Sequence, residues 1–417
     1  MNNTIDTQSL VKQGVTHHHR RGGLVTEPTI VLLGGARTPV GSFGGVLKDV
    51  PAHQLGAAAA RAALERSGVA ADEVDEVVMG CIGQVGPDAY NARRVAISAG
   101  LPARTPAFTV NRLCGSGLQA IWSAAQEIRW GAASIALAGG NESMSRMPFY
   151  DFDARGGYRL ANRSLVDGTL AMLTDPFHGI HMGVTAENVA AKYEVSREMQ
   201  DAFAVESQRR AATEAAKAAF AEEITPVQTG GRKPVTITFD EHPKPSTTGE
   251  MLAALRPAFQ PDGTVTAGNS SGINDGAAAV VVTTEEIARA RGVTHVVALQ
   301  AVTTAAVEPE LMGYAPVHAL RALFAQTGTT PADIGTIELN EAFAAQAVAC
   351  LRDTGLDPAR VNPFGGAIAL GHPVGATGAI LTLRAMNTML RDDHELGIVT
   401  MCIGGGQALA ALLRQVA

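Results

Sequence analysis

Two cysteines and one histidine stand in glycine-rich segments that leave little bulk around them. Cys114 lies in LCGSGLQAI, His372 in LGHPVGATGAI and Cys402 in CIGGG. A thiol can attack an acyl carbonyl, and an imidazole can take the proton from that thiol. Glycines leave room for a bulky thioester to approach the sulfur. These residue types therefore suit covalent acyl transfer.

Cys114 falls between a predicted strand, 107–110, and a predicted helix, 118–130. The positive end of the helix would lower the pKa of the thiol and favour the thiolate. Unpaired amides of the turn could also face a developing oxyanion. A tight turn around a structural, buried cysteine explains this segment equally well.

His372 is held between glycines and a proline, which would fix its imidazole in a rigid turn, as a general base requires. A histidine with a purely structural role in the turn is the alternative. Asn340 follows a predicted strand, and its amide could hold a water or a substrate oxygen. Helix N-capping is the simpler interpretation of Asn340.

The elements that must position these residues alternate between short apolar strands and helices. In the first part of the chain we expect strands at 29–35, 73–79, 107–110 and 134–139, and helices at 53–67 and 118–130. This alternation predicts an α/β fold with a largely parallel sheet and ligands near the carboxyl ends of its strands.

An irregular stretch from 141 to 271 interrupts this pattern and carries one strongly helical segment, 196–222, with Ser196 as its N-cap. The pattern then returns. We expect helices at 316–326, 341–352 and 376–390, strands at 336–339 and 398–403, and a glycine-rich turn at 365–375. Both halves place a reactive side chain in a glycine-rich turn before a helix of small residues, which predicts an internal repeat.

Composition narrows the class of protein. A chain of 417 residues is expected to form two or more packed domains. The net charge of −7 and the lack of a basic run argue against a nucleic-acid partner or an anionic membrane surface. No apolar run approaches the ~20 residues that span a bilayer, so we expect a soluble protein.

The first 25 residues are polar and read as a disordered leader, and the triplet His17–His19 is not expected to bind a metal. The four cysteines match neither a metal-binding pair nor a dense disulfide framework. We therefore expect reduced thiols, a cytoplasmic protein and no metal.

Taken together, the segments resemble the thiolase family over nearly the whole chain from Thr29 to Leu413. The resemblance is closest to the acetyl-CoA C-acetyltransferases and short-chain β-ketothiolases. It is carried by NRLCGSGLQA (111–120), GGNESMS (139–145), HMGVTAENVA (181–190), RPAF (256–259), GTVTAGNSSGINDGAAA (263–279), NEAFAAQA (340–347), GGAIALGHPVGATGA (365–379) and CIGGGQALA (402–410).

This resemblance implies a fold of two similar α/β halves in α-β-α-β-α layers, with an inserted loop domain over the site. The N-terminal half would span 26–143 and be completed by 274–293. The loop domain that covers the coenzyme A site would span 144–273. The C-terminal half would span 294–417.

The resemblance also implies catalytic roles. Cys114 would carry the acyl group as a thioester, His372 would activate Cys114, and Cys402 would move the α-proton of the second acyl-CoA. Backbone amides of Cys114 and Gly404 would form one oxyanion hole. His372 and a water held by Asn340 would form the other.

For coenzyme A, Ser271 would bind the pantetheine. The walls of its tunnel would be His181, Met182, Leu173, Phe259, Ala267 and Phe343. Lys244 departs from the family pattern, which has arginine against the adenine. Lysine keeps the charge but loses the planar stack, so we expect weaker binding of coenzyme A. Phe364 and the segment 81–83 also depart from the pattern and bear on the shape of the acyl pocket.

The implied reaction is the reversible condensation of two acetyl-CoA to acetoacetyl-CoA and coenzyme A, with no permanently bound cofactor and a homotetrameric assembly. Two enzyme alternatives are a degradative thiolase for longer or dicarboxylic 3-oxoacyl-CoA and a decarboxylating condensing enzyme. The presence of Cys402 argues against the second. A non-catalytic acyl-CoA-binding protein should lack at least one reactive residue, whereas Cys114, Asn340, His372 and Cys402 are all present.

Overall fold

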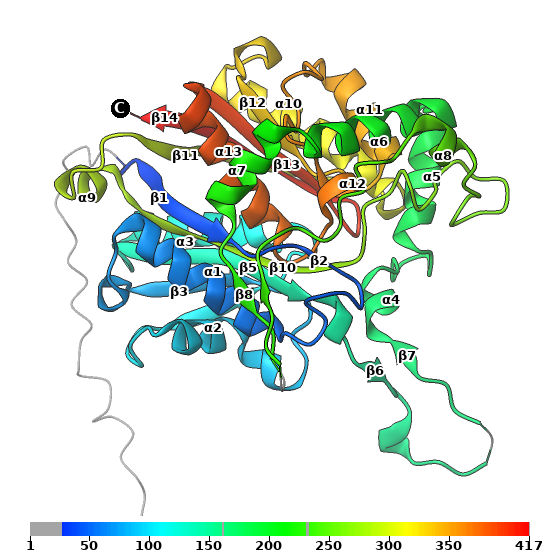
Figure 1. Ribbon diagram of the computed structural model, residues 1–417, viewed down its shortest axis with the longest axis horizontal. Coiled ribbons are helices and arrows are strands. Elements are labelled where there is room, and N and C mark those ends of the chain that lie inside the picture. The colour runs from blue at the N-terminus through cyan, green and yellow to red at the C-terminus, as the bar shows by residue number, and fades with distance from the viewer. Residues whose placement is uncertain (1–26, 161, 231–232, 417) are drawn as a thin grey trace, which may run out of the picture.

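The computed structural model describes residues 27–160, 162–230 and 233–416, so the leader expected at 1–25 lies outside the described residues. One mixed sheet runs through both halves of the described chain (Figure 1). Its strand order is β12 (Thr336–Leu339), β13 (Leu396–Ile403), β14 (Gln407–Val416), β11 (Val296–Ala306), β1 (Ile30–Arg37), β10 (Asn274–Thr284), β5 (Ile135–Ser143), β3 (Glu76–Gly80) and β4 (Ala107–Val110), with β2 (Gly41–Ser42) paired to β10.

The expectation of a largely parallel sheet is wrong. Among the described strands, only β3–β4, β3–β5 and β12–β13 pair in parallel. β10 returns after the irregular stretch and lies antiparallel to both β1 and β5. β14, which the sequence analysis missed, follows β13 as an antiparallel hairpin. Strand directions depend on which distant segments meet, and a local pattern carries no such information.

The helices confirm the five layers expected from the sequence. Helices α1 (Ala52–Ser67) and α2 (Asn91–Ala99) cover the outer face of the N-terminal half. Helices α3 (Ser116–Trp130) and α13 (Thr377–Asp392) form the central layer and pack against strands of both halves. Helices α10 (Ala315–Thr327) and α11 (Ala344–Thr354) cover the outer face of the C-terminal half. The two helices that carry or follow the reactive turns are therefore neighbours at the centre.

The irregular stretch contains short elements and three longer helices. It comprises β6 (Phe149–Tyr150), β7 (Val166–Asp167), α4 (Gly168–Met172), α5 (Met182–Lys192), α6 (Arg197–Ala211), α7 (Glu214–Glu223), β8 (Val227–Gln228), β9 (Thr236–Ile237) and α8 (Gly249–Ala253). Ser196 caps α6 as predicted. The single helix expected at 196–222 is in fact two, because Thr213 interrupts it and caps α7.

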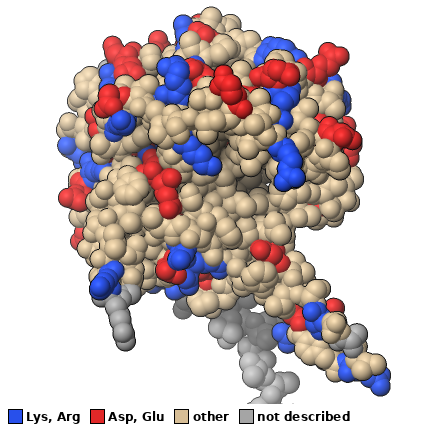
Figure 2. Space-filling model, turned by 45° about the vertical axis from the view of Figure 1, so that its right-hand side comes forward, with Lys and Arg blue, Asp and Glu red and all other residues tan. Residues whose placement is uncertain are grey.

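The hairpin of β6 and β7, which we call the arm, projects away from the body of the molecule (Figures 1 and 2). It exposes large apolar side chains, among them Phe149 (62% exposed), Phe152 (76%) and Leu165 (61%). Exposed apolar area of this kind marks a contact surface more often than a solvated one.

Two short α-helices remain, α9 (Glu285–Ala290) after β10 and α12 (Ala367–Leu370) inside the glycine-rich turn. Within the described ranges, no helix has the length and apolar character that crossing a membrane would need.

Candidate active site

The turn that carries Cys114 is locked by its own neighbours. Helix α3 begins at Ser116, and the Ser116 hydroxyl donates to the Leu113 carbonyl at 2.6 Å and accepts from the Arg112 amide at 2.9 Å. Leu113 has a φ of 46°, in the left-handed region that a non-glycine residue rarely adopts. This strained turn, fixed by Ser116, presents the thiol at the start of α3.

The thiol of Cys114 faces a cavity and is otherwise enclosed by protein. Burial raises its pKa to about 11, while hydrogen bonds from the backbone amides of Gly404 and of Cys114 itself act in the opposite direction. The expected net lowering of this pKa is therefore wrong, because desolvation outweighs the amides at the helix terminus. The resting nucleophile is a neutral thiol that needs a base.

His372 is buried, and its ring is held by a threonine that the sequence analysis did not assign. The Thr377 hydroxyl lies 2.6 Å from Nδ1 of His372 and donates its proton to the Pro373 carbonyl at 3.0 Å. It therefore accepts from Nδ1–H, which leaves the lone pair on Nε2. Burial lowers the pKa of His372 to about 4, so the imidazole is neutral near pH 7. The His372 amide donates to Oδ1 of Asn274 at 2.8 Å.

Asn340 follows β12 and points its side chain at His372. Its Nδ2 lies 3.5 Å from Nε2 of His372, and its Oδ1 is buried without a partner among the described atoms. Helix α11 begins only at Ala344 with Phe343 as its N-cap, so the capping interpretation of Asn340 is wrong. The amide is free to hold a group inside the site.

Cys402 ends β13, just before the hairpin turn to β14. It is buried and lines the same cavity as Cys114 and His372, and burial raises the pKa of its thiol well above the usual value. Gly404 follows in the turn, with its amide facing Cys114. The two thiols and the imidazole, which come from both halves of the chain, thus meet at one place.

The cavity that they line measures about 330 Å³. Every tunnel residue expected from the sequence lines it: Leu173, His181, Met182, Phe259, Ala267, Ser271 and Phe343. The His181 ring stacks on Phe259 with centroids 5.0 Å apart, and Phe259 meets Phe343 edge to face at 6.0 Å. This aromatic wall gives the tunnel a rigid apolar side.

A second cavity, of about 360 Å³, opens on the other side of Cys114. Ile82, Met172 and Phe177 line it together with Gly404. Ile82 belongs to the segment 81–83 that departs from the family pattern, so that departure does shape the space beside the nucleophile.

Two residues singled out from the sequence lie elsewhere. Lys244 is exposed and lines neither cavity. Its backbone amide donates to Oε1 of Gln208 at 2.8 Å. Phe364 is buried, with the Arg391 guanidinium 4.6 Å from its ring centre. Phe364 therefore contributes to packing and not to the acyl pocket.

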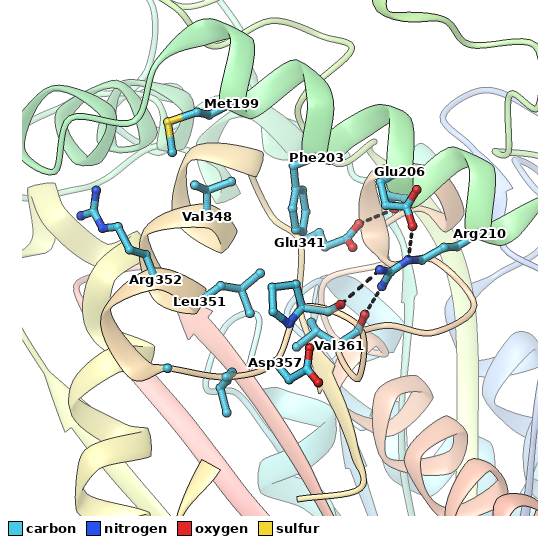
Figure 3. Close-up of a pocket in the computed structure, with 14 residues that line it drawn as sticks. Met199, Phe203, Glu206, Arg210, Glu341, Val348, Leu351, Arg352, Asp357 and Val361 are labelled. Atoms are coloured by element: carbon cyan, nitrogen blue, oxygen red, sulfur yellow. Dashed lines mark hydrogen bonds and ion pairs between the residues drawn. The ribbon is translucent and has the colours of Figure 1, made fainter. Parts of the chain in front are cut away.

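A larger cavity of about 750 Å³ lies between α6 and α11 (Figure 3), and none of the reacting residues lines it. Glu341 forms part of its wall. Its carboxylate accepts from the Ser207 hydroxyl at 2.6 Å, from Nδ2 of Asn362 at 2.8 Å and from the Ile368 amide at 3.2 Å. Glu341 thereby ties α6 to the loop that leads to His372.

Several polar residues that contact the site lie inside the sequence motifs given above, although the motifs alone do not indicate their roles. Thr377 stands five residues after His372 in GHPVGATG, Glu142 stands in GGNESMS, and Asn274 stands in SGINDG. The sequence feature that could have indicated them is a small polar or acidic residue inside an otherwise apolar, glycine-rich motif. Their partners depend on the tertiary fold. Among the described residues, no cluster of three or more His, Cys, Asp or Glu side chains is arranged to hold a metal.

Two family models match consecutive parts of the chain. The thiolase N-terminal domain matches residues 30–286, and the thiolase C-terminal domain matches residues 293–415. The chain belongs to the thiolase family. The thiolase domains thus include both reactive turns, with Cys114 in the first and His372 and Cys402 in the second.

Relatives in this family align over nearly their full length. A beta-ketothiolase, BktB, of Cupriavidus necator is 48% identical over 390 residues, 93% of this chain and 99% of the relative. An acetyl-CoA acetyltransferase of Pseudomonas aeruginosa is 46% identical over 387 residues, 92% of this chain and 98% of the relative.

Solved structures agree with this thiolase fold. The acetyl-CoA acetyltransferase of Bacillus anthracis superposes with a TM-score of 0.91 at 38% identity, covering 94% of this chain and 99% of its own. Human mitochondrial 3-ketoacyl-CoA thiolase in complex with CoA superposes with a TM-score of 0.89 at 38% identity, covering 94% and 98%.

Proposed function

We propose that the protein is an acetyl-CoA C-acetyltransferase that condenses two acetyl-CoA to acetoacetyl-CoA and coenzyme A, and that also runs the reverse thiolysis. One observation carries the proposal: Cys114, His372 and Cys402 line a single cavity. Two thiols and one imidazole supply a nucleophile and the bases for two successive transfers. The names of the thiolase relatives support the same reaction.

In the first transfer, Nε2 of His372 takes the Cys114 proton, and the sulfur attacks the acyl carbonyl. The hydrogen bonds that the Gly404 and Cys114 amides give to the sulfur support their role as donors to the oxyanion. Collapse of the adduct breaks the bond between carbonyl and coenzyme A, whose sulfur leaves with the proton of the Cys402 thiol, while His372 keeps the proton taken from Cys114. The acyl group stays on Cys114 as a thioester.

In the second transfer, the Cys402 thiolate left by the first transfer takes an α-proton from a second acetyl-CoA. The resulting enolate oxygen is stabilised by the Nε2–H of protonated His372 and by a water on Asn340, whose Oδ1 lacks a protein partner among the described atoms. The α-carbon then attacks the acyl thioester, the new carbon–carbon bond forms, and the Cys114 sulfur leaves and regains its proton from His372. Thiolysis is the same sequence reversed.

Coenzyme A would enter through the cavity lined by the aromatic wall, with Ser271 hydrogen-bonded to the pantetheine. Its acyl end would then lie at Cys114, because the cavity ends at the reactive residues. Lys244 would meet the adenine end outside the tunnel, which agrees with its exposed position. Residues 144–273 would act as the covering unit, since they supply His181 and Phe259 to this cavity.

A second candidate function is the thiolysis of longer 3-oxoacyl-CoA. The cavity of about 360 Å³ beyond Cys114 favours it, because an acetyl group alone would leave most of that space empty. Apolar walls such as Ile82 and Met172 suit an alkyl chain.

We also propose a homotetramer located in the cytoplasm. The exposed apolar side chains of the arm support an assembly of several copies, since they would otherwise remain in contact with water. The cytoplasmic setting rests on the four free cysteines, none of which is paired in the described chain.

The test is a thiolysis assay with purified protein, coenzyme A and 3-oxoacyl-CoA of increasing length from acetoacetyl-CoA to the ten-carbon thioester. We expect cleavage of acetoacetyl-CoA to acetyl-CoA. Lack of turnover with every substrate would refute the enzyme proposal. Turnover only with the longer substrates would favour the second candidate.

A further inference from the structure

A buried carboxylate lies between the two halves of the site and has no role in the reaction described above. Glu142, near the end of β5, is 1% exposed. Its oxygens accept from the Ile82 amide at 3.0 Å, from the Gly83 amide at 2.9 Å and from the Gly375 amide at 3.1 Å. The Cys81 sulfur lies 3.6 Å from Oε1.

These contacts join segments that flank the reacting atoms. Ile82 lines the cavity beside Cys114, and Gly375 belongs to the turn that carries His372. A Cβ at Gly375 would lie 2.5 Å from Oε2 of Glu142, so the carboxylate and the turn are in direct contact. One side chain therefore spans the gap between the loop of the N-terminal half and the turn of the C-terminal half.

We propose that Glu142 is a positioning residue, and that its ionised form holds the Ile82 loop and the His372 turn in the arrangement that acyl transfer needs. This inference rests on the proposed function. A carboxylate offers only acceptors, so it can bind three amides at once. A protonated carboxyl turns one oxygen into a donor, which then faces an amide N–H and loses at least one of these bonds.

The contact should make activity depend on pH near neutrality, because burial raises the pKa of Glu142 to about 7. The titratable and charged groups around Glu142 and the segments it holds are Cys81, Asp88, Arg94, Cys114, Arg146 and His372. The pKa of Cys114 is raised to about 11, that of Cys81 is raised well above its usual value, and that of His372 is lowered to about 4. The pKa of Asp88 is lowered as well, so Cys81, Cys114, His372 and Asp88 do not change charge near pH 7. His53, whose Nδ1 lies 3.7 Å from Oδ1 of Asp88, is a further titratable group on this side.

The experiment measures kcat and KM for acetoacetyl-CoA thiolysis across the pH range for the wild type and for Glu142→Gln. In the wild type we expect kcat to fall as pH drops below about 7, where Glu142 becomes protonated. Glutamine cannot ionise and places an N–H₂ against the amides. Glu142→Gln should therefore show a kcat at least about tenfold lower above pH 7, with no fall near pH 7 and with little change in KM.

Glu338→Gln is the matched control. Glu338 is also fully buried, burial raises its pKa to about 8, and it contacts neither the Ile82 loop nor the Gly375 turn. We expect this variant to keep the decline below pH 7. If Glu338→Gln loses the decline, or if Glu142→Gln keeps the wild-type rate and profile, the proposal is overturned.

The wild-type profile decides the matter even if Glu142→Gln does not fold. An active wild type whose kcat is flat between about pH 6 and 8 overturns the role of Glu142 and leaves the proposed function intact. A wild type that does not cleave acetoacetyl-CoA at any pH overturns the proposed function and this inference together.

Discussion

The hydroxyl oxygen of Thr377 lies 2.6 Å from Nδ1 of His372 and accepts the ring proton, because its own proton goes to the Pro373 carbonyl. This contact leaves the Nε2 lone pair directed at the Asn340 amide, 3.5 Å away. A neutral histidine can carry its proton on either nitrogen, and only one of these tautomers can act as a base through Nε2. Thr377 selects that tautomer.

Replacing Thr377 by valine should therefore lower kcat strongly in a protein that still folds. We expect a loss of roughly 10-fold to 100-fold in kcat for acetoacetyl-CoA thiolysis, the range found when the hydrogen-bond partner that orients a metal-bound histidine is removed. Thr377→Ser should restore most of the rate. Thr382→Val is the control, because Thr382 is also buried in α13 but bonds only to the Gly378 carbonyl. An equal loss in both variants would contradict the tautomer argument.

An acyl-trapping experiment should distinguish the roles of Cys114 and Cys402. Cys114→Ala should form no covalent acyl-enzyme with acetyl-CoA, since the attacking sulfur is gone. Cys402→Ala should still be acylated on Cys114 but should fail to form acetoacetyl-CoA. Mass spectrometry of the intact protein after a short incubation reports the acyl adduct. Loss of the adduct in both variants would refute this division of roles.

The resting state of Cys114 has its own signature. Because burial raises its thiol pKa to about 11, the thiolate fraction at neutral pH is small and should grow about tenfold per pH unit. The rate of Cys114 alkylation by iodoacetamide, followed by peptide mapping, should rise in that way from about pH 7 to 9. A rate that is already constant above about pH 7 would instead indicate a preformed thiolate–imidazolium pair.

The three residues proposed for catalysis could be singled out from the sequence because each lies in a glycine-rich segment, and the resemblance to the thiolase family implied their roles. The contacts that orient these three residues could not be predicted from the sequence. Thr377 reaches His372 only because the turn closes on itself, and Glu142 reaches Gly375 across 233 positions of the chain. The direction of the shift in the Cys114 pKa was also missed, because the helix terminus is visible in the sequence whereas burial is a property of the packed fold.

In the fold, too, local features could be predicted from the sequence better than features that depend on distant contacts. Local patterns located α1, α3, α10, α11 and α13 to within a few residues, whereas α2 and α5 were not predicted. The patterns also failed where one capping residue divides a helix, as at Thr213. The antiparallel centre of the sheet could not be predicted, because the placement of β10 between β1 and β5 is settled by contacts across the inserted stretch. β14 was missed because the segment was noted only for its glycines and Cys402.

A buried ion-pair cluster around Glu223 should contribute more to the free energy of unfolding than an ion pair at the surface. Glu223 is 1% exposed and lies 2.7 Å from Nε of Arg37 and 3.4 Å from Arg384. Glu223→Gln leaves these buried guanidinium groups less compensated, so we expect the free energy of unfolding to drop by about 3 kcal/mol in chaotrope titrations. Glu214→Gln should cause no measurable change, because Glu214 and its partner Lys217 are exposed. Equal losses of unfolding free energy in Glu223→Gln and Glu214→Gln would contradict the stabilising role of the buried cluster.

The cavity beyond Cys114 can be tested by filling it. Ala171 of α4 lines that cavity, whereas its neighbour Leu170 does not, although both residues are exposed. If the cavity holds the alkyl chain of a longer 3-oxoacyl group, Ala171→Trp removes space for methylenes that each contribute about 0.8 kcal/mol when buried. The kcat/KM for the ten-carbon substrate should then fall at least about tenfold more than that for acetoacetyl-CoA. Leu170→Trp should leave the ratio of the two unchanged. A ratio that is also unchanged in Ala171→Trp would mean that the chain lies elsewhere and that the cavity does not set chain length.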